Sequence, residues 1–129
     1  MKRISSGSRF EELAGYCRAV VVDDATGSWI FVSGTTGYDY RDHTIADDVT
    51  AQTHACFANI EAALARAGAT LADLVRIRVF LTDADDLLAA AAVIGEKCRA
   101  NPPANTTVVT QLVAPEMKIE IEVTARRAH

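Results

Sequence analysis

The segment KIEIEVT, residues 118–124, constrains the fold of this chain more than any other stretch. Its three β-branched apolar residues alternate with lysine, glutamate and threonine, and a period of two is typical of a strand with one buried face. Glutamate is a poor strand former, so the carboxylates of Glu120 and Glu122 need a reason to be there. They are either solvated, or paired with cations across a sheet, or part of a functional site.

Other strands are predicted from similar patterns. The tail, residues 101–124, reads as two strands joined by a turn that contains proline, with the first strand over Thr106–Val113. Cys17–Val22 and Trp29–Val32 flank a turn sequence and predict a hairpin, and residues 2–5 predict a short edge strand. Phe10–Gly15 is expected to be a connection without regular structure. Leu74–Thr82 predicts a half-buried strand, whose members are Val75, Ile77, Val79 and Leu81 on the inner face and Arg76, Arg78 and Phe80 on the outer face. Its two arginines are natural cross-strand partners for Glu120 and Glu122.

Two helices are predicted between these strands. The first is capped by Asp47 or Asp48 and ends at Gly68, and its buried stripe is expected to be Val49, Thr53, Cys56, Ile60, Ala63 and Ala67. The second begins at Asp83 and ends before Asn101-Pro102-Pro103, with a predicted stripe of Leu87, Ala91, Ile94 and Cys98. The order of elements indicates one α+β domain over residues 1–129, with a single layer of two helices on one face of a mixed sheet. The other face of the sheet is left uncovered, which favours an oligomer.

Composition excludes several classes of function. The formal net charge is −4, the pI is about 5.3 and no run of lysine or arginine occurs, so the chain is a poor candidate for nucleic-acid binding. No apolar run reaches membrane-spanning length, and the N-terminus lacks the apolar stretch of a signal peptide. Three cysteines then suggest reduced thiols in the cytoplasm. His54 has no ligand partner at helical spacing, so no metal site is expected, and Ser33–Gly37 lacks the spacing of a nucleotide-binding loop.

At this point several segments together resemble the RidA/YjgF family, which older usage labels endoribonuclease L-PSP or translation-initiation inhibitor. The resemblance covers essentially the whole chain, and its pieces are Gly15-Tyr16, Ser33-Gly34, the helix DDVTAQTHACFANIEAALARAGA, the strand VRIRVFLTDADDL and the tail PPANTTVV…APEMKIEIEVTA. It implies a chorismate-mutase-like fold and a homotrimer whose sheets face inward as a barrel, with a small-molecule cleft between each pair of subunits. In active members these clefts hydrolyse enamines and imines such as 2-aminoacrylate without a cofactor.

The resemblance also implies residue roles. Glu120 corresponds to the glutamate that positions water, and Tyr16, Ser33 and Gly34 correspond to residues that line the cleft. The family's arginine, which grips the substrate carboxylate, is replaced by Asn105. An asparagine amide lacks the charge and the bidentate grip of a guanidinium. The other departures are Thr35 for a common glutamine, Asp85 for an asparagine and Thr107 for a small residue, and all make the cleft less suited to an anion.

Two functions therefore stay open. The chain is either an imine or enamine hydrolase whose substrate differs from 2-aminoacrylate, or a binding or regulatory trimer that has lost this activity. A ribonuclease function follows only from the older label, and the acidic pI and the lack of a histidine pair argue against it. Cys17 follows Tyr16, so strand alternation directs it away from the cleft, which favours a core or interface thiol over a nucleophile.

Overall fold

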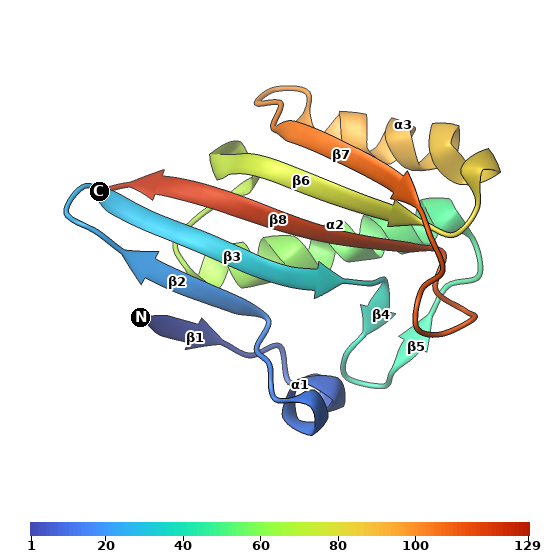
Figure 1. Ribbon diagram of the computed structural model, residues 1–129, viewed down its shortest axis with the longest axis horizontal. Coiled ribbons are helices and arrows are strands. Elements are labelled where there is room, and N and C mark those ends of the chain that lie inside the picture. The colour runs from blue at the N-terminus through green and yellow to red at the C-terminus, as the bar shows by residue number, and fades with distance from the viewer.

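The computed structural model describes residues 1–129 and is built on a six-stranded mixed sheet (Figure 1). The strands lie in the order β1-β2-β3-β8-β6-β7, and neighbours are antiparallel except for β6 and β7, which run parallel. Their bounds are β1 Lys2–Ile4, β2 Ala19–Asp23, β3 Gly27–Thr35, β6 Leu74–Leu81, β7 Ala104–Val109 and β8 Ile119–Ala128. The strand with the alternating sequence, β8, thus lies at the centre of the sheet and pairs on both sides.

Helices lie beside this sheet as the element order predicts. In Figure 1, α2 runs behind the strands and α3 lies toward the β6–β7 edge, and α2 packs against β3, β8 and α3. The helices are α1 Arg9–Ala14, α2 Val49–Arg66 and α3 Leu87–Cys98, with short 3-10 turns η1 Leu71–Asp73 and η2 Ala84–Asp86 and a small ribbon of β4 Tyr38–Asp39 and β5 Thr44–Ile45. The predicted α+β layer is confirmed, with α1 and the ribbon as additions. None of the helices combines the length and the apolar character needed to cross a membrane.

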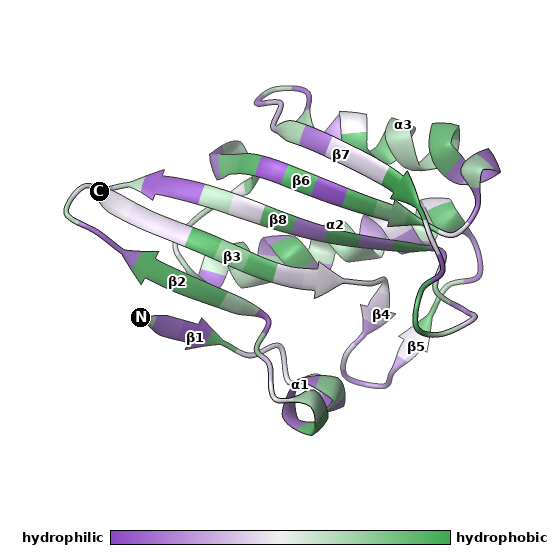
Figure 2. Cartoon of the chain, in the orientation of Figure 1, coloured by the Kyte–Doolittle hydropathy of each residue, from purple (hydrophilic) through white to green (hydrophobic).

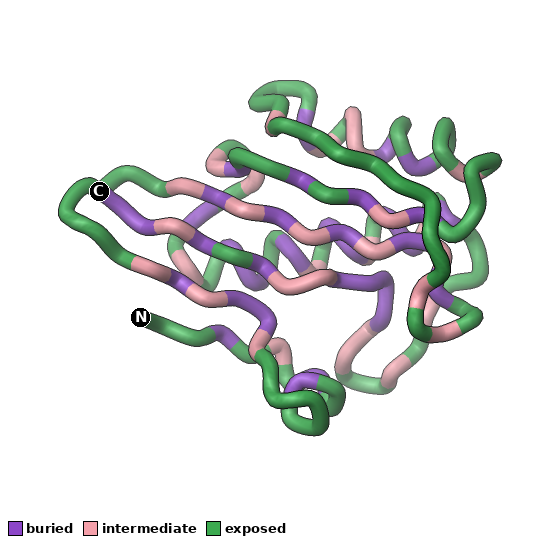
Figure 3. The backbone as a smooth tube through the Cα atoms, in the orientation of Figure 1, coloured by how far each residue is buried: buried purple, intermediate pink, exposed green.

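The core joins the inner face of the sheet to the helices. It is one cluster of 23 buried apolar residues, to which β8 contributes Ile119, Ile121, Val123 and Ala125. Figure 2 shows hydrophobic and hydrophilic residues alternating along β6 and β8, and Figure 3 shows buried and less buried residues alternating along β8 in the same way. Burial of these alternating side chains is what holds the sheet against the helices, because apolar area removed from water is the main favourable contribution to folding.

Local signals placed α2 correctly. The Asp48 carboxylate accepts a hydrogen bond from the Ala51 main-chain N–H, so Asp48 is the cap. The predicted stripe is buried from Val49 to Ala63, Ala67 packs against the core, and His54 is exposed as expected. The helix ends before Gly68, whose φ of 75° is a left-handed conformation that glycine adopts without strain.

The interpretation of Phe10–Gly15 as a connection was wrong, because it forms most of α1. The Ser8 hydroxyl accepts a hydrogen bond from the Phe10 main-chain N–H, and Gly15 ends the helix in a left-handed conformation. Serine followed three residues later by Glu11 is a helix-start pattern that the sequence carried. The helix is only six residues long, too short for an apolar period to indicate it.

The two tail strands do not pair with each other. β6 lies between β7 and β8, and β7 runs parallel to β6 at the edge of the sheet, where all six of its residues are exposed. The strand predicted over Thr106–Val113 begins earlier, at Ala104, and ends at Val109. The hairpin of β2 and β3 is confirmed, although β2 starts at Ala19 instead of Cys17.

Two predicted apolar faces are also shifted. In α3 the buried residues are Ala90, Val93 and Cys98, whereas Leu87 is 47% exposed, because the sequence LLAAAAVIGEKC is apolar nearly all round and spacing cannot select a face. In β6 the ladder shifts between Leu74 and Arg76, so Leu74 is buried and Val75 is 43% exposed. Beyond this bulge the inner face is as predicted.

Candidate functional site

Glu120 is not the cross-strand partner of an arginine. In the register of β6 and β8, Glu122 lies opposite Arg78 and their side chains form an ion pair with an N–O distance of 3.0 Å. Glu120 lies opposite Phe80 instead and makes no ion pair. The cross-strand explanation therefore accounts for Glu122 and leaves Glu120 half-buried without a cationic partner within salt-bridge distance.

Gly34 makes room for this carboxylate. A Cβ atom built at Gly34 would lie 2.6 Å from the Glu120 Oε2 atom, closer than side chains approach. The glycine stands where the pairing of β3 with β8 shifts register, between Val32 and Thr35. Glycine at this point of a strand is a mark of close approach by another group, here the Glu120 carboxylate.

Arg18 also contacts the end of β3 at Gly34. It is 3% exposed, and its Nη1 donates hydrogen bonds to the Gly34 carbonyl oxygen at 2.8 Å and to Thr35 Oγ1 at 3.1 Å. Its Nη2 lies 3.7 Å from the carboxylate of Glu11, which is 4% exposed and belongs to α1. The buried guanidinium thus ties α1 and the end of β3 to the place where Glu120 lies.

The surroundings of Glu120 alter its acidity. Burial raises the pKa of the carboxyl above its usual 4.5, the positive charge of Arg18 lowers it, and the negative charge of Glu122 raises it further. The raising influences prevail. A carboxylate with a raised pKa is a stronger base, which is the property that general-base catalysis uses.

Aromatic side chains form the walls of a pocket beside Glu120. Its volume is about 300 Å³, and its lining includes Phe10, Tyr16, Tyr38, Tyr40 and His43 together with Gly34 and Glu120. The guanidinium carbon of Arg18 lies 5.7 Å from the ring centroid of Tyr16 and 5.1 Å from that of Tyr40. A cation at this distance from a ring centroid is attracted to the face of the ring.

The segment between β4 and β5 supplies one side of this pocket. The rings of Tyr38 and His43 stack with centroids 4.4 Å apart, and Phe10 of α1 lies 5.3 Å from the same imidazole. His43 has a φ of 59°, a conformation that non-glycine residues seldom adopt and that often marks functional segments. The Tyr38 hydroxyl donates a hydrogen bond of 2.5 Å to Glu116, and burial together with this carboxylate raises the pKa of Tyr38 to about 12. Tyr38 is therefore a neutral hydrogen-bond donor at neutral pH.

Comparison with known proteins identifies the family. The model of a family described as endoribonuclease L-PSP matches residues 6–127. The chain belongs to the endoribonuclease L-PSP family. It is similar to the crystal structure of Rv2704 from Mycobacterium tuberculosis, a member of the YjgF/YER057c/UK114 family, with 38% identity, a TM-score of 0.86 and 98% of each chain covered. The resemblance to the RidA/YjgF family is thus confirmed.

Two relatives agree in length as well as in sequence. Protein DfrA of Myxococcus xanthus is 32% identical over 125 residues, which cover 96% of this chain and 94% of that protein. The RutC family protein PYRAB12510 of Pyrococcus abyssi is 32% identical over 111 residues, which cover 85% of this chain and 84% of that protein. The similarity to these two relatives thus extends over most of the chain.

Within this family fold, three of the expected site residues come together. Tyr16, Gly34 and Glu120 line one pocket. Ser33 lies beside it, and its hydroxyl donates a hydrogen bond to the Cys17 carbonyl oxygen at 2.7 Å. The Cys17 thiol in turn donates to the Ala19 carbonyl oxygen and does not line the pocket.

The other three expected residues are not part of this pocket. Asn105 and Thr107 are exposed on the edge strand β7, where the Thr107 hydroxyl donates to Asn105 Oδ1 at 2.8 Å. Asp85 is exposed in η2. A single subunit thus brings only part of the expected set together, and a cleft that includes Asn105 would need a second copy of the chain.

Arg18 and the aromatic residues of 38–43 are the pocket residues that sequence reasoning missed. The sequence carried no signal for Arg18, because an arginine directly before the apolar run Ala19–Val22 is ordinarily exposed, and its burial depends on partners from α1 and β3. Nothing local pointed to His43, since its place depends on how β4 and β5 fold back toward α1.

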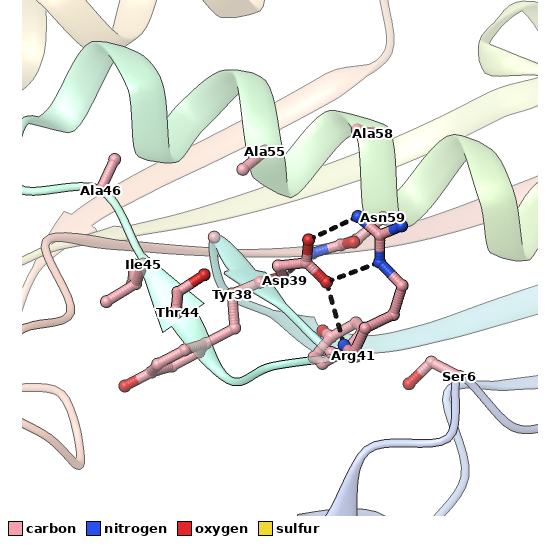
Figure 4. Close-up of a pocket in the computed structure, with 12 residues that line it drawn as sticks. Ser6, Tyr38, Asp39, Arg41, Thr44, Ile45, Ala46, Ala55, Ala58 and Asn59 are labelled. Atoms are coloured by element: carbon pink, nitrogen blue, oxygen red, sulfur yellow. Dashed lines mark hydrogen bonds and ion pairs between the residues drawn. The ribbon is translucent and has the colours of Figure 1, made fainter.

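A larger hollow, with a volume of about 630 Å³, shares Tyr38 and Tyr40 with this pocket. Figure 4 shows Arg41 turned back onto Asp39, with Ala55, Ala58 and Asn59 presented by α2. The charged groups that line this hollow, Arg41 and Asp39, are paired with each other at 2.8 Å. The pKa of the Asp39 carboxyl is lowered, so the hollow offers no carboxylate with a raised pKa. The pocket at Glu120 is therefore the better candidate. No group of three or more histidine, cysteine, aspartate or glutamate side chains is placed to hold a metal ion.

Proposed function

We propose that this chain hydrolyses imines or enamines in the pocket at Glu120, as a homotrimer whose clefts are completed by neighbouring subunits. The observation that carries the proposal is the half-buried carboxylate of Glu120, which no arginine of β6 pairs with and which faces an aromatic pocket. In this proposal Glu120 takes a proton from the attacking water, and Tyr16 and Gly34 shape the site. Membership of the RidA/YjgF family supports it.

The substrate is proposed to differ from 2-aminoacrylate. Asn105 stands where active relatives place the arginine that grips a carboxylate, and a neutral amide binds a carboxylate less strongly. Asp85 and Thr107, at other positions expected in the cleft, supply no cation that could replace it. The same argument supports the alternative of a non-catalytic small-molecule-binding or regulatory trimer.

The trimer is proposed from the open face of the sheet. Phe31 is 48% exposed there and lines a hollow together with Arg76, Arg78 and Glu122. Light scattering at micromolar concentration should give about three times the chain mass of 13.8 kDa. A stable monomer would contradict the proposed clefts. A cytoplasmic location stays a prediction that rests on the free thiols.

The test of function is a screen of imines generated in situ from neutral and acidic amino acids and from amines. Release of carbonyl product is measured with wild type, Glu120→Gln and the matched control Glu61→Gln, which alters the same chemical group at an exposed position of α2 outside the pocket. Turnover that is lost only in Glu120→Gln, with the oligomer intact, supports hydrolysis. Specific binding without turnover of any substrate would favour the binding protein. The acidic charge and the single histidine in the pocket argue against a ribonuclease activity.

A further inference from the structure

The charges around the pocket favour a cationic ligand. Arg18 is the one lysine or arginine among the residues that line it. Outside the lining, Arg9 places its guanidinium carbon 5.6 Å from the ring centroid of Phe10. Three carboxylates outnumber these two guanidiniums: Glu120 in the lining, Glu11 against Arg18, and Glu116 against the lining residue Tyr38. The local field is therefore negative, which attracts cations and repels carboxylates.

Arg18 is poorly placed to hold a ligand carboxylate. Its Nη1 already donates to Gly34 and Thr35, and its Nη2 faces Glu11. Its Nε lacks an acceptor but is buried, and the rings of Tyr16 and Tyr40 lie within 5.7 Å and 5.1 Å of the guanidinium carbon. A carboxylate at Arg18 would have to enter beside these rings and compete with Glu11 for the guanidinium charge.

The aromatic lining of the pocket also favours a cationic ligand. Tyrosine and phenylalanine rings present a negative face, which binds cations, and they also bury flat apolar groups. The stacked Tyr38 and His43 and the neighbouring Phe10 form such a wall, and Met117 and Val113 add apolar surface. A pocket of about 300 Å³ has room for one small ring with a short substituent.

We infer that this pocket takes a small molecule with a flat apolar body and a positively charged nitrogen but no carboxylate, such as the protonated imine of an arylalkylamine. The hydrolytic step rests on the proposed function, whereas the preference for charge does not.

The reaction converts R–CH=NH₂⁺ and water into R–CHO and NH₄⁺. Glu120 accepts a proton as water oxygen bonds to carbon, and the C=N π electrons move to nitrogen. The carboxyl then returns the proton to that nitrogen. The C–N bond breaks as the hydroxyl oxygen forms C=O and gives its proton to the carboxylate, and the departing ammonia takes up that proton.

Binding of three probes tests the charge preference. Benzylammonium carries the cation, benzyl alcohol is its neutral counterpart, and benzoate carries the carboxylate. Calorimetry with the intact oligomer should give benzylammonium about tenfold tighter than benzyl alcohol, the scale of one desolvated cation–π or charge contact. Benzoate should bind more weakly than either.

Two variants show whether the preference arises in this pocket. Glu120→Gln removes one negative charge from the lining and should reduce the preference for benzylammonium over benzyl alcohol to less than about threefold. The control Glu61→Gln, at an exposed position of α2 outside the lining, should leave the preference unchanged. Equal thermal stability and oligomeric state across the three proteins shows that folding is intact.

Turnover separates this inference from the proposed function. An amine oxidase supplies the imine of benzylamine, and an L-amino acid oxidase supplies the carboxylate-bearing imine of phenylalanine. Faster hydrolysis of the first supports both proposals. A cation preference in binding without turnover supports this inference and refutes hydrolysis. Tighter binding of benzoate, faster turnover of the phenylalanine imine, or no binding of any probe at millimolar concentration would overturn the inference.

Discussion

Replacement of Arg18 by methionine should destabilise the fold more than loss of any exposed ion pair. Arg18→Met removes a buried guanidinium, its two hydrogen bonds to Gly34 and Thr35, and the partner of Glu11. Removing one member of a buried pair costs about 3–5 kcal/mol of unfolding free energy. We expect about 3 kcal/mol, the lower end of that range, because Glu11 keeps hydrogen bonds from the Ser6 main-chain N–H and hydroxyl.

Urea unfolding at one fixed protein concentration measures this cost. With a urea dependence of about 1–3 kcal/mol per molar, the midpoint should fall by roughly 1–3 M. The matched control is Arg41→Met, which breaks a shorter ion pair of 2.8 Å to Asp39 whose side chains are 90% and 36% exposed. Solvent screens such pairs, so the control should leave the urea midpoint nearly unchanged.

The difference in stability between these two variants shows whether burial makes the Arg18 ion pair important. If Arg18→Met unfolds within about 1 kcal/mol of wild type, or if Arg41→Met lowers the midpoint as much, burial is not what makes the Arg18 pair matter. A double variant, Arg18→Met with Glu11→Gln, should recover part of the loss, because it removes the unpaired buried charge. No recovery would show that the lost hydrogen bonds at Gly34 and Thr35 carry the effect instead.

Three further predictions follow from the same geometry. Gly34→Ala should lower turnover at least about tenfold with the oligomer retained, because a methyl group 2.6 Å from Oε2 must displace Glu120; unchanged kinetics would show that the carboxylate position is not critical. Wild type should scarcely hydrolyse the imine of 2-aminoacrylate, and Asn105→Arg should gain ketoacid release, whereas a wild type as fast as an arginine-bearing relative would refute the role given to Asn105. Burial raises the folded-state pKa of Glu120 above 4.5, so activity should rise and the free energy of unfolding should fall as the pH rises through that pKa. Glu122→Gln removes a charge that raises this pKa further, so it should move both changes to lower pH. Profiles of the variant that are identical to those of wild type would contradict this coupling.

Sequence alone determined the elements whose signals are local. The alternation of β8 requires one buried face whatever strand lies beside it, and the observed burial of Ile119, Ile121 and Val123 follows from that period. The cap at Asp48, the apolar stripe and Gly68 likewise define α2 within a single stretch of chain. The family resemblance was equally accessible, because it rests on motifs in order along the chain. In α3 the same reasoning failed, since a helix that is apolar nearly all round contains no preferred face.

Only the tertiary structure decided which residues meet. Periodicity specifies which face of a strand is buried but not its neighbour or its register, and these are set by packing between distant segments. Because β6 lies between β7 and β8, the two tail strands do not pair. The register of β6 with β8 places Arg78 opposite Glu122 and Phe80 opposite Glu120. Glu120 became available to a pocket for that reason. The pocket itself draws on α1, the start of β2, the end of β3 and the β4–β5 ribbon, and Arg18 joins the first three of these because burial of its charge requires partners that lie far apart in the sequence.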